Sequence, residues 1–115
     1  MTSSSTDPAA KFDTSRASEY ARQSRIALAG YDACHDLAAC MLAATLGPAR
    51  TANVLVVGAG GTAQEIIAMA ALEPDWCFTA VDPSAPMLEA ATQQLQANDL
   101  LGRTDVHLGH VEDLP

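Results

Sequence analysis

The stretch of sequence that decides the fold is VLVVGAGGTAQE at residues 54–65. The apolar run over 52–57, interrupted only by Asn53 and rich in β-branched residues, predicts a parallel strand inside a sheet and covered on both faces. The glycines allow a tight turn, and we expect a helix over about 62–72, where Thr62 and Glu65 form a capping box. Asp82 lies about 24 positions beyond Gly58 and closes the next predicted strand. This strand-loop-helix-strand unit is typical of domains that hold a nucleoside-containing cofactor across the carboxyl ends of parallel strands.

The sequence before this unit predicts an arm and helices. Residues 1–16 are rich in Ser, Thr, Asp and Pro and predict a flexible arm, and residues 17–50 form a helical segment. Within that segment we expect a short helix over 18–26 and a second helix over 31–46, which Gly47 and Pro48 end. The second helix is expected to bury one apolar stripe, formed by Tyr31, Cys34, Ala38, Met41, Leu42 and Thr45.

Residues 51–115 predict the order β-α-β-α-β. The second strand is expected over 77–81, and Ser84 then caps a helix that accepts Pro86 in its first turn and ends at about 98–102. That helix is expected to bury Met87, Leu88, Ala91 and Leu95. A third strand follows over 104–108. The predicted fold class is therefore α/β, a Rossmann-like parallel sheet preceded by a helical cap.

The predicted sheet has strands on only one side of its first strand. A doubly wound domain places strands on both sides, so the apolar run at 54–57 would form an open sheet edge, which folded proteins avoid. We therefore expect the chain to be the first half of a larger domain, apparently truncated, with 51–115 as the cofactor-binding portion. Such a half-domain is expected to be a poor catalyst by itself.

Charge and composition limit the class of protein. The net charge is −8, and residues 51–115 contain Arg103 alone against nine acidic residues. So few cations argue against nucleic acid as a partner of this portion and suit a neutral or positively charged ligand, although surface carboxylates that serve only solubility explain the charge equally well. No apolar run is long enough to span a bilayer. The start of the chain has no secretion signal, and three cysteines indicate reduced, partly buried thiols in the cytoplasm.

Two classes of cofactor fit the glycine turn and Asp82. The GxGxxA pattern at 58–63 satisfies the relaxed dinucleotide fingerprint, and the acid can accept hydrogen bonds from the ribose of NAD or of S-adenosylmethionine. About fifty residues precede the turn, whereas dinucleotide enzymes often begin near it. Pro83 and Met87 can form an apolar slot against a base, and the loop at 109–115 can close over it. These features favour S-adenosylmethionine, and an NAD(P)-binding oxidoreductase is the alternative.

The chain resembles the class I S-adenosylmethionine-dependent methyltransferases in three blocks, which occur in the order and spacing of that family. The blocks are VLVVGAGGTAQE at 54–65, TAVDPSAPMLEAA at 79–91 and GHVEDLP at 109–115. An upstream segment, SRIALAGYD at 24–32, is similar to an element that supplies a cofactor-contacting tyrosine in the branch related to tRNA-wobble-uridine modification. The resemblance covers about residues 17–115, which corresponds to the first half of a family domain.

The resemblance implies a methyltransferase that uses S-adenosylmethionine, and it assigns roles to individual residues. The cofactor-contacting residues that it implies are Tyr31, Gly58, Ala59, Gly60, Asp82, Pro83, Met87, His110 and Val111. The three loop residues would line the methionine portion, and the aspartate would hold the ribose. The proline and methionine would flank the adenine, the backbone of the valine would contact it, and the tyrosine would close the pocket. His110 stands where many members have an acid, so Glu112 or Asp113 could serve instead.

The implied reaction is direct displacement at the sulfonium methyl, in which the protein aligns the reacting atoms and excludes water. The residues that would select or deprotonate the acceptor normally follow the fourth strand, so no catalytic base is assigned and the acceptor is unknown. We expect His35 to be a surface or structural residue and Cys77 to be a small hydrophobe in a buried strand. His107 and His110 lack a third ligand at suitable spacing, so we expect no metal site.

Each implied site residue also has a purely structural interpretation. Gly58 and Gly60 could form a plain strand-to-helix turn, Asp82 could serve only to start the following helix, and Tyr31 could be a core residue. A non-catalytic function is a further alternative. In that case the half-domain would pair its exposed strand, 52–57, with a partner chain.

Overall fold

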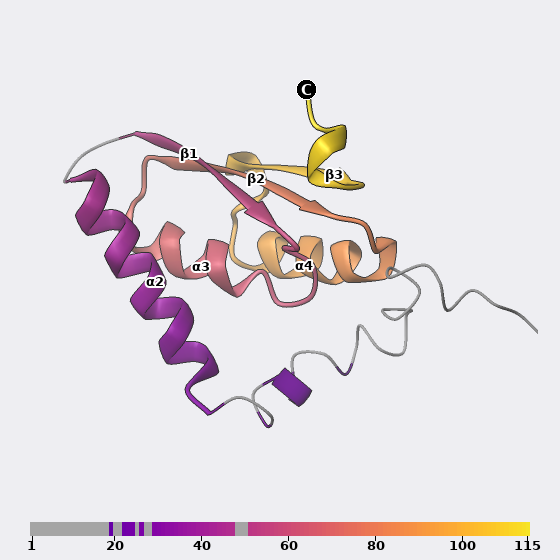
Figure 1. The fold of residues 1–115 in the computed structure, drawn as a ribbon, viewed down its shortest axis with the longest axis horizontal. Coiled ribbons are helices and arrows are strands. Elements are labelled where there is room, and N and C mark those ends of the chain that lie inside the picture. The colour runs from indigo at the N-terminus through magenta and orange to yellow at the C-terminus, as the bar shows by residue number, and fades with distance from the viewer. Residues whose placement is uncertain (1–18, 20–21, 25, 27–28, 48–50) are drawn as a thin grey trace, which may run out of the picture.

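The computed structural model describes residues 19, 22–24, 26, 29–47 and 51–115 (Figure 1). The predicted flexible arm lies outside the described residues, as do Pro48 and much of the helix expected over 18–26. The described residues of that helix are helical, and Arg22 forms an ion pair with Glu19 at 3.3 Å.

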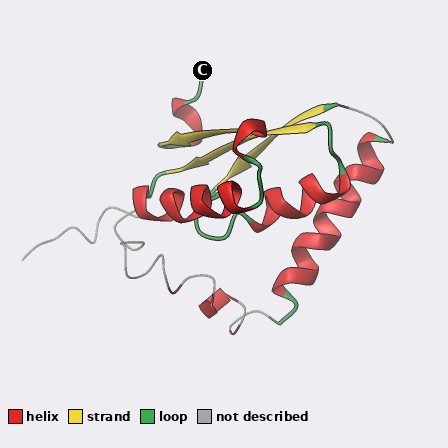
Figure 2. Ribbon diagram, turned by 180° about the vertical axis from the view of Figure 1, so that it is seen from behind, coloured by secondary structure: helices red, strands yellow, loops and turns green. Residues whose placement is uncertain are grey.

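Three parallel strands form one sheet, and the three long helices lie on one face of it (Figure 2). The sheet order is β1-β2-β3. The elements are, in chain order, α2 (Tyr31–Leu46), β1 (Ala52–Val57), α3 (Gln64–Leu72), β2 (Trp76–Asp82), α4 (Ala85–Ala97), the short helix η3 (Leu101–Arg103), β3 (Thr104–Leu108) and the short helix η4 (Val111–Asp113). This order confirms the predicted α/β class and the predicted succession of strands and helices.

The core lies between the sheet and the helical layer. β2 is the central strand, and its Phe78 pairs in register with Val54 on one side and Thr104 on the other. Alternate residues of a strand point to opposite faces, and on β2 the side chains that face the helices are buried. The largest fully buried side chains are Trp76, Ile66, Leu95 and Val81. A core that is aliphatic except for Trp76 and Phe78 therefore holds the two layers together.

β1 lies at the open edge of the sheet, as the missing flank predicted. It is not covered on both faces, however. Val56 is buried against the helices, whereas Leu55 is 48% exposed and Val57 is 60% exposed. The prediction that both faces of this strand are covered was wrong. Apolar residues on both faces show that a strand can be buried on both, but α2, α3 and α4 cover only one face of the sheet (Figure 2).

α2 has the predicted bounds and ends at Gly47, but the predicted buried stripe was wrong. Tyr31 and Leu42 are half-buried as expected, whereas Met41 is 62% exposed. The other expected stripe residues, Cys34, Ala38 and Thr45, are also exposed. The side that packs on α3 instead runs through His35 and Ala39. Residues 37–46 contain no charged side chain, so the helical period was visible in the sequence but the buried side was not.

The two later helices begin differently. α3 begins at Gln64, after Ala63 in the left-handed conformation with φ 53°, and no side chain caps it. The predicted capping box of Thr62 and Glu65 was therefore wrong, because the chain makes one more turn before the helix starts. α4 begins as predicted. Ser84 Oγ accepts a hydrogen bond from Met87 N–H at 3.4 Å, Pro86 lies in the first turn, and the four predicted apolar residues are buried.

The burial predicted for the cysteines was wrong. The free thiols of Cys34, Cys40 and Cys77 are all exposed. Cys77 lies on the sheet face that the described helices leave bare, which explains why a central strand does not bury it. None of the described helices is long and apolar enough to cross a membrane.

Candidate cofactor site

The three strands end at one edge of the sheet and bring the three sequence blocks together. Gly58 N–H donates to Val81 O at 2.8 Å, and Gly109 N–H donates to Asp82 O at 3.0 Å. The loop after β1, the end of β2 and the loop after β3 therefore meet at the carboxyl ends of the strands. Open α/β sheets bind their ligands at this edge.

The loop between β1 and α3 uses its backbone donors within the protein. The N–H groups of residues 58–61 donate, in order, to Val81 O (2.8 Å), Val81 O (3.3 Å), Asp82 Oδ2 (3.0 Å) and Met87 O (2.8 Å). A loop that binds a pyrophosphate presents such backbone amides to the ligand. Here all four already have an acceptor inside the chain, so this turn is not built as a phosphate cradle.

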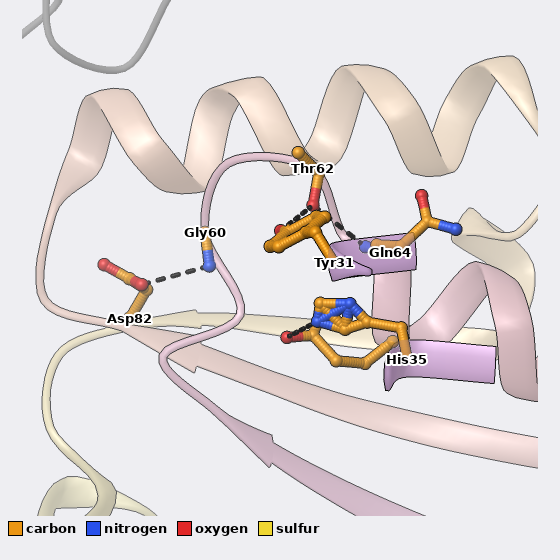
Figure 3. A network of polar contacts seen from close by, with 7 residues as sticks. Tyr31, His35, Gly60, Thr62, Gln64 and Asp82 are labelled. Atoms are coloured by element: carbon orange, nitrogen blue, oxygen red, sulfur yellow. Dashed lines mark hydrogen bonds and ion pairs between the residues drawn. The ribbon is translucent and has the colours of Figure 1, made fainter. Parts of the chain in front are cut away.

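Asp82 connects the glycine loop to the start of α4. Its Oδ2 accepts from Gly60 N–H at 3.0 Å (Figure 3). Its Oδ1 accepts from Ser84 N–H at 2.9 Å. The side chain is buried. An ionised carboxylate has about four acceptor positions, so these two bonds leave capacity for ligand hydroxyls. The structural role considered for Asp82 is therefore present, and it is compatible with a ligand role.

The two predicted loop glycines serve different purposes. Gly58 has φ +72°, and a β-carbon built there would meet no atom within 4 Å, so the residue borders open space. A β-carbon at Gly60 would lie 2.6 Å from Met87 Cβ and 2.9 Å from Asp82 Oδ2. Gly60 is therefore required for close packing of the loop against β2 and α4, whereas Gly58 allows the turn.

The loop after β3 is held by its own carboxylate. Asp113 Oδ2 accepts from His110 N–H at 3.0 Å and would lie 3.1 Å from a β-carbon at Gly109. His110, Val111 and Glu112 are exposed. Of the two acids expected to replace the family acid, Asp113 is thus occupied within its own loop. Across the described part of the chain, no group of three or more His, Cys, Asp or Glu side chains could hold a metal ion.

Tyr31 reaches the glycine loop from α2. Its hydroxyl lies 3.3 Å from Thr62 Oγ1, which also accepts from Gln64 N–H at 3.2 Å (Figure 3). The Tyr31 ring packs edge-on against the His35 ring with centroids 4.6 Å apart. His35 Nε2 in turn faces Glu65 Oε2 at 3.7 Å.

The sequence analysis did not predict this series of contacts between α2 and the start of α3. The signal that could have shown it is the spacing of Tyr31 and His35, since residues four apart lie on one face of a helix. His35 has the structural role that was one of its two expected roles. Its Nδ1 is buried without a hydrogen-bond partner.

Burial divides the expected cofactor-contacting residues into two groups. The residues with exposed or half-buried surfaces are Tyr31, Gly58, Pro83, His110 and Val111. The buried residues are Ala59, Gly60, Asp82 and Met87. The first group surrounds the carboxyl ends of the strands and can present atoms to a ligand. The second group shapes the loop, and within it only the aspartate has unused acceptor capacity.

No protein-family model matches the sequence, and no curated protein matches it. The fold does match solved structures. One is a protein of Methanococcus maripaludis, provisionally described as an S-adenosyl-L-methionine-dependent methyltransferase, with a TM-score of 0.71, 23% identity, and coverage of 90% of this chain and 45% of that chain. Another is the [4+2]-cyclase SpnF, with a TM-score of 0.59, 21% identity, and coverage of 74% and 29%. A third is coclaurine N-methyltransferase bound to N-methylheliamine and S-adenosylhomocysteine, with a TM-score of 0.54, 16% identity, and coverage of 74% and 24%.

These likenesses concern the fold. The chain spans less than half the length of each of the three proteins. One of them is a cyclase, and a fold by itself does not determine a reaction. The chain has the Rossmann-like fold of the S-adenosylmethionine-dependent methyltransferases and corresponds to the N-terminal part of that fold.

Proposed function

We propose that this chain binds S-adenosylmethionine at the carboxyl ends of its strands and supplies the cofactor-binding part of a methyltransferase. The observation that carries the proposal is the glycine loop, in which all four backbone amides of 58–61 donate within the chain while Asp82 keeps acceptor capacity. The site thus has hydrogen-bond acceptors for hydroxyl groups, whereas its backbone N–H groups are not free to bind a phosphate.

The same observation weighs against a dinucleotide. A pyrophosphate needs backbone donors or cations. Arg103 is the one Lys or Arg in residues 51–115, and its guanidinium donates to Trp76 O at 2.9 Å and to Glu73 O at 2.7 Å. These carbonyls lie at the amino end of β2, opposite the candidate site. A cofactor with a sulfonium and no phosphate suits the site better.

The residues at the strand ends divide the cofactor between them. Asp82 holds the ribose hydroxyls, and the loop at Gly58 borders the methionine portion. Pro83 and the backbone of Val111 lie beside the adenine. Tyr31, fixed against Thr62, covers the methionine end. Gly60, Ala59 and Met87 support the loop from below.

When bound, S-adenosylmethionine supplies an electrophilic methyl group. The chain's own residues contribute to catalysis by holding the cofactor in one orientation and by limiting the access of water, which lowers the entropic cost of the displacement. The acceptor and its base are not assigned to residues of this chain. Because the chain covers 45% of the Methanococcus maripaludis protein, we propose that it transfers methyl groups poorly by itself.

Calorimetry on the 115-residue chain tests the proposal. We expect S-adenosylhomocysteine to bind and NADH not to bind. Asp82→Asn removes ribose acceptor capacity and should weaken binding at least about tenfold, since a hydrogen bond to a charged group contributes about 1.5–3 kcal/mol. The matched control is Asp75→Asn in the exposed turn before β2, which should leave affinity unchanged.

A second variant covers the case in which Asp82→Asn fails to fold. His110→Asp restores, at an exposed position, the acid that resembling proteins carry, and it should tighten binding of S-adenosylhomocysteine several-fold. The proposal would be wrong if the folded wild-type chain preferred NADH, or if it bound no S-adenosylhomocysteine at saturating concentration.

A further inference from the structure

The packing of α2 on α3 is apolar along most of its length. The residues of these two helices that belong to the core or pack against it are Ala39, Leu42, Ala43, Ile66, Ile67, Ala68, Met69 and Ala70. Aliphatic side chains of similar size tolerate repacking, so they hold two helices together better than they fix how far one is shifted along the other. More specific contacts are needed to set that register, and they occur at the amino end of α2.

Two polar contacts join this end of α2 to the glycine loop and to the first turn of α3. Tyr31 Oη lies 3.3 Å from Thr62 Oγ1, and His35 Nε2 lies 3.7 Å from Glu65 Oε2. Tyr31 and His35 are four positions apart and share one face of α2. These four residues are named the α2–loop clamp. A shift of α2 by one turn, about 5.4 Å, would break both contacts at once.

The two contacts of the clamp are coupled through the rings. The Tyr31 and His35 rings meet edge-on, with centroids 4.6 Å apart and an interplanar angle of 87°, which is a favoured arrangement of aromatic rings. Figure 3 shows the Tyr31 ring between Thr62 and His35. Thr62 Oγ1 also accepts from Gln64 N–H at 3.2 Å, so this hydroxyl is anchored to the start of α3. A displacement of His35 therefore acts directly on the tyrosine.

Packing alone does not explain a histidine at position 35. The side chain is 18% exposed, and its Nδ1 is buried without a hydrogen-bond partner. A buried polar atom of this kind lowers stability, and an apolar side chain would avoid the loss. The Glu65 carboxylate accepts hydrogen bonds, so it favours the tautomer with the proton on Nε2. The carboxylate thus orients the ring.

We propose that His35 and Glu65 are positioning residues, which hold the Tyr31 side chain at the glycine loop and so keep the methionine end of the cofactor site covered. They act through Tyr31 and do not supply a ligand contact of their own. The inference rests on the proposed function, in which Tyr31 covers that end of the cofactor. Loss of either residue lets α2 move relative to the loop, while the ribose contact of Asp82 remains.

Calorimetry on the 115-residue chain with S-adenosylhomocysteine and with adenosine tests the inference. His35→Ala and Glu65→Gln should each weaken binding of S-adenosylhomocysteine about two- to fivefold, the range for one aromatic or partly exposed ionic contact. Binding of adenosine, which lacks the amino-acid portion, should be unchanged. The matched controls are Asp36→Ala, at the exposed position next to His35, and Asp75→Asn, and both should bind the two ligands as wild type does. Equal loss of affinity for both ligands would overturn the inference.

A double-mutant cycle shows whether the effect passes through Tyr31. In a Tyr31→Ala background, His35→Ala should have no further effect on the affinity for S-adenosylhomocysteine, because the side chain that His35 positions is already absent. Additive losses would overturn the inference. It would also be overturned if His35→Ala and Glu65→Gln bound S-adenosylhomocysteine as tightly as wild type.

Nuclear magnetic resonance without ligand separates a failure of this inference from a failure of the proposed function. The chain has two tyrosines, so carbon-13 labelling of tyrosine gives two sets of ring signals, which Tyr20→Phe assigns. We expect a nuclear Overhauser contact between the Tyr31 ring and the Thr62 methyl group in wild type and in both controls, and a weaker one in both clamp variants. An unchanged contact in the clamp variants would overturn the inference even in a chain that binds S-adenosylhomocysteine. A wild-type chain that binds no S-adenosylhomocysteine but shows these changes would contradict the proposed function and still support the positioning of Tyr31.

Discussion

Gly60 and Gly58 illustrate how much one side chain position decides at this site. A β-carbon at position 60 would lie 2.6 Å from Met87 Cβ, whereas one at position 58 would meet nothing within 4 Å. In the sequence the two glycines are equivalent members of one pattern. The structure separates them, because only Gly60 lies against both Asp82 and the first turn of α4.

Gly60→Ala should lower the free energy of unfolding by about 1–3 kcal/mol, the usual cost of forcing an extra methyl group into a packed site. Urea denaturation followed by circular dichroism measures the change as a shift of the midpoint. Gly102→Ala is the control, because its β-carbon would meet no atom within 4 Å, and it should stay within about 0.5 kcal/mol of wild type. Equal midpoints for the two variants would contradict the packing role of Gly60.

At the scale of elements, local chemistry decides where α4 begins, whereas tertiary packing decides where α3 begins. Ser84 and Pro86 start α4 where they were expected to, because a cap acts within one turn. Thr62 does not cap α3, since its hydroxyl lies between Tyr31 and Gln64 N–H instead. The Thr62 side chain is held by Tyr31, which lies thirty-one positions earlier in the chain. The residues around Thr62 do not predict this contact.

Arg103 holds the amino end of β2 to the short helix η3. Its guanidinium donates to Trp76 O and Glu73 O, and it lies 5.8 Å from the Phe78 ring centroid. Trp76 is among the largest fully buried side chains. The single cation of residues 51–115 therefore serves the fold at the end of the sheet opposite the candidate cofactor site.

Arg103→Met keeps an apolar stem but removes the donors to two backbone carbonyls. We expect a loss of about 2 kcal/mol in unfolding free energy, the order expected for hydrogen bonds to a charged group. Thermal and urea denaturation check this value. Arg22→Met, which removes only an exposed ion pair with Glu19, should change stability by less than about 0.5 kcal/mol. Affinity for S-adenosylhomocysteine should be unchanged in both variants, since neither residue lies at the strand ends.

At the scale of the whole molecule, α2, α3 and α4 cover one face of a three-stranded sheet, and no described helix or strand covers most of the other face or the outer edge of β1 (Figure 2). The structural match to the Methanococcus maripaludis protein includes 90% of this chain but only 45% of that protein. Of the exposed large apolar side chains among the described residues, five lie on α2 and β1 (Leu37, Met41, Leu46, Leu55 and Val57) and five lie elsewhere (Ile26, Leu72, Leu101, Leu108 and Val111).

The sequence by itself determined the order of the elements, the parallel sheet, the strand ends at which Gly58, Asp82 and His110 meet, and the start of α4. These features depend on short-range chemistry: β-branched runs, glycine turns, a serine cap and right-handed crossovers. Only the tertiary structure decided which side of α2 is buried, which face of β1 is covered, and where the loop amides donate. An evenly apolar helix or strand can bury either side, so packing against a neighbour makes the choice.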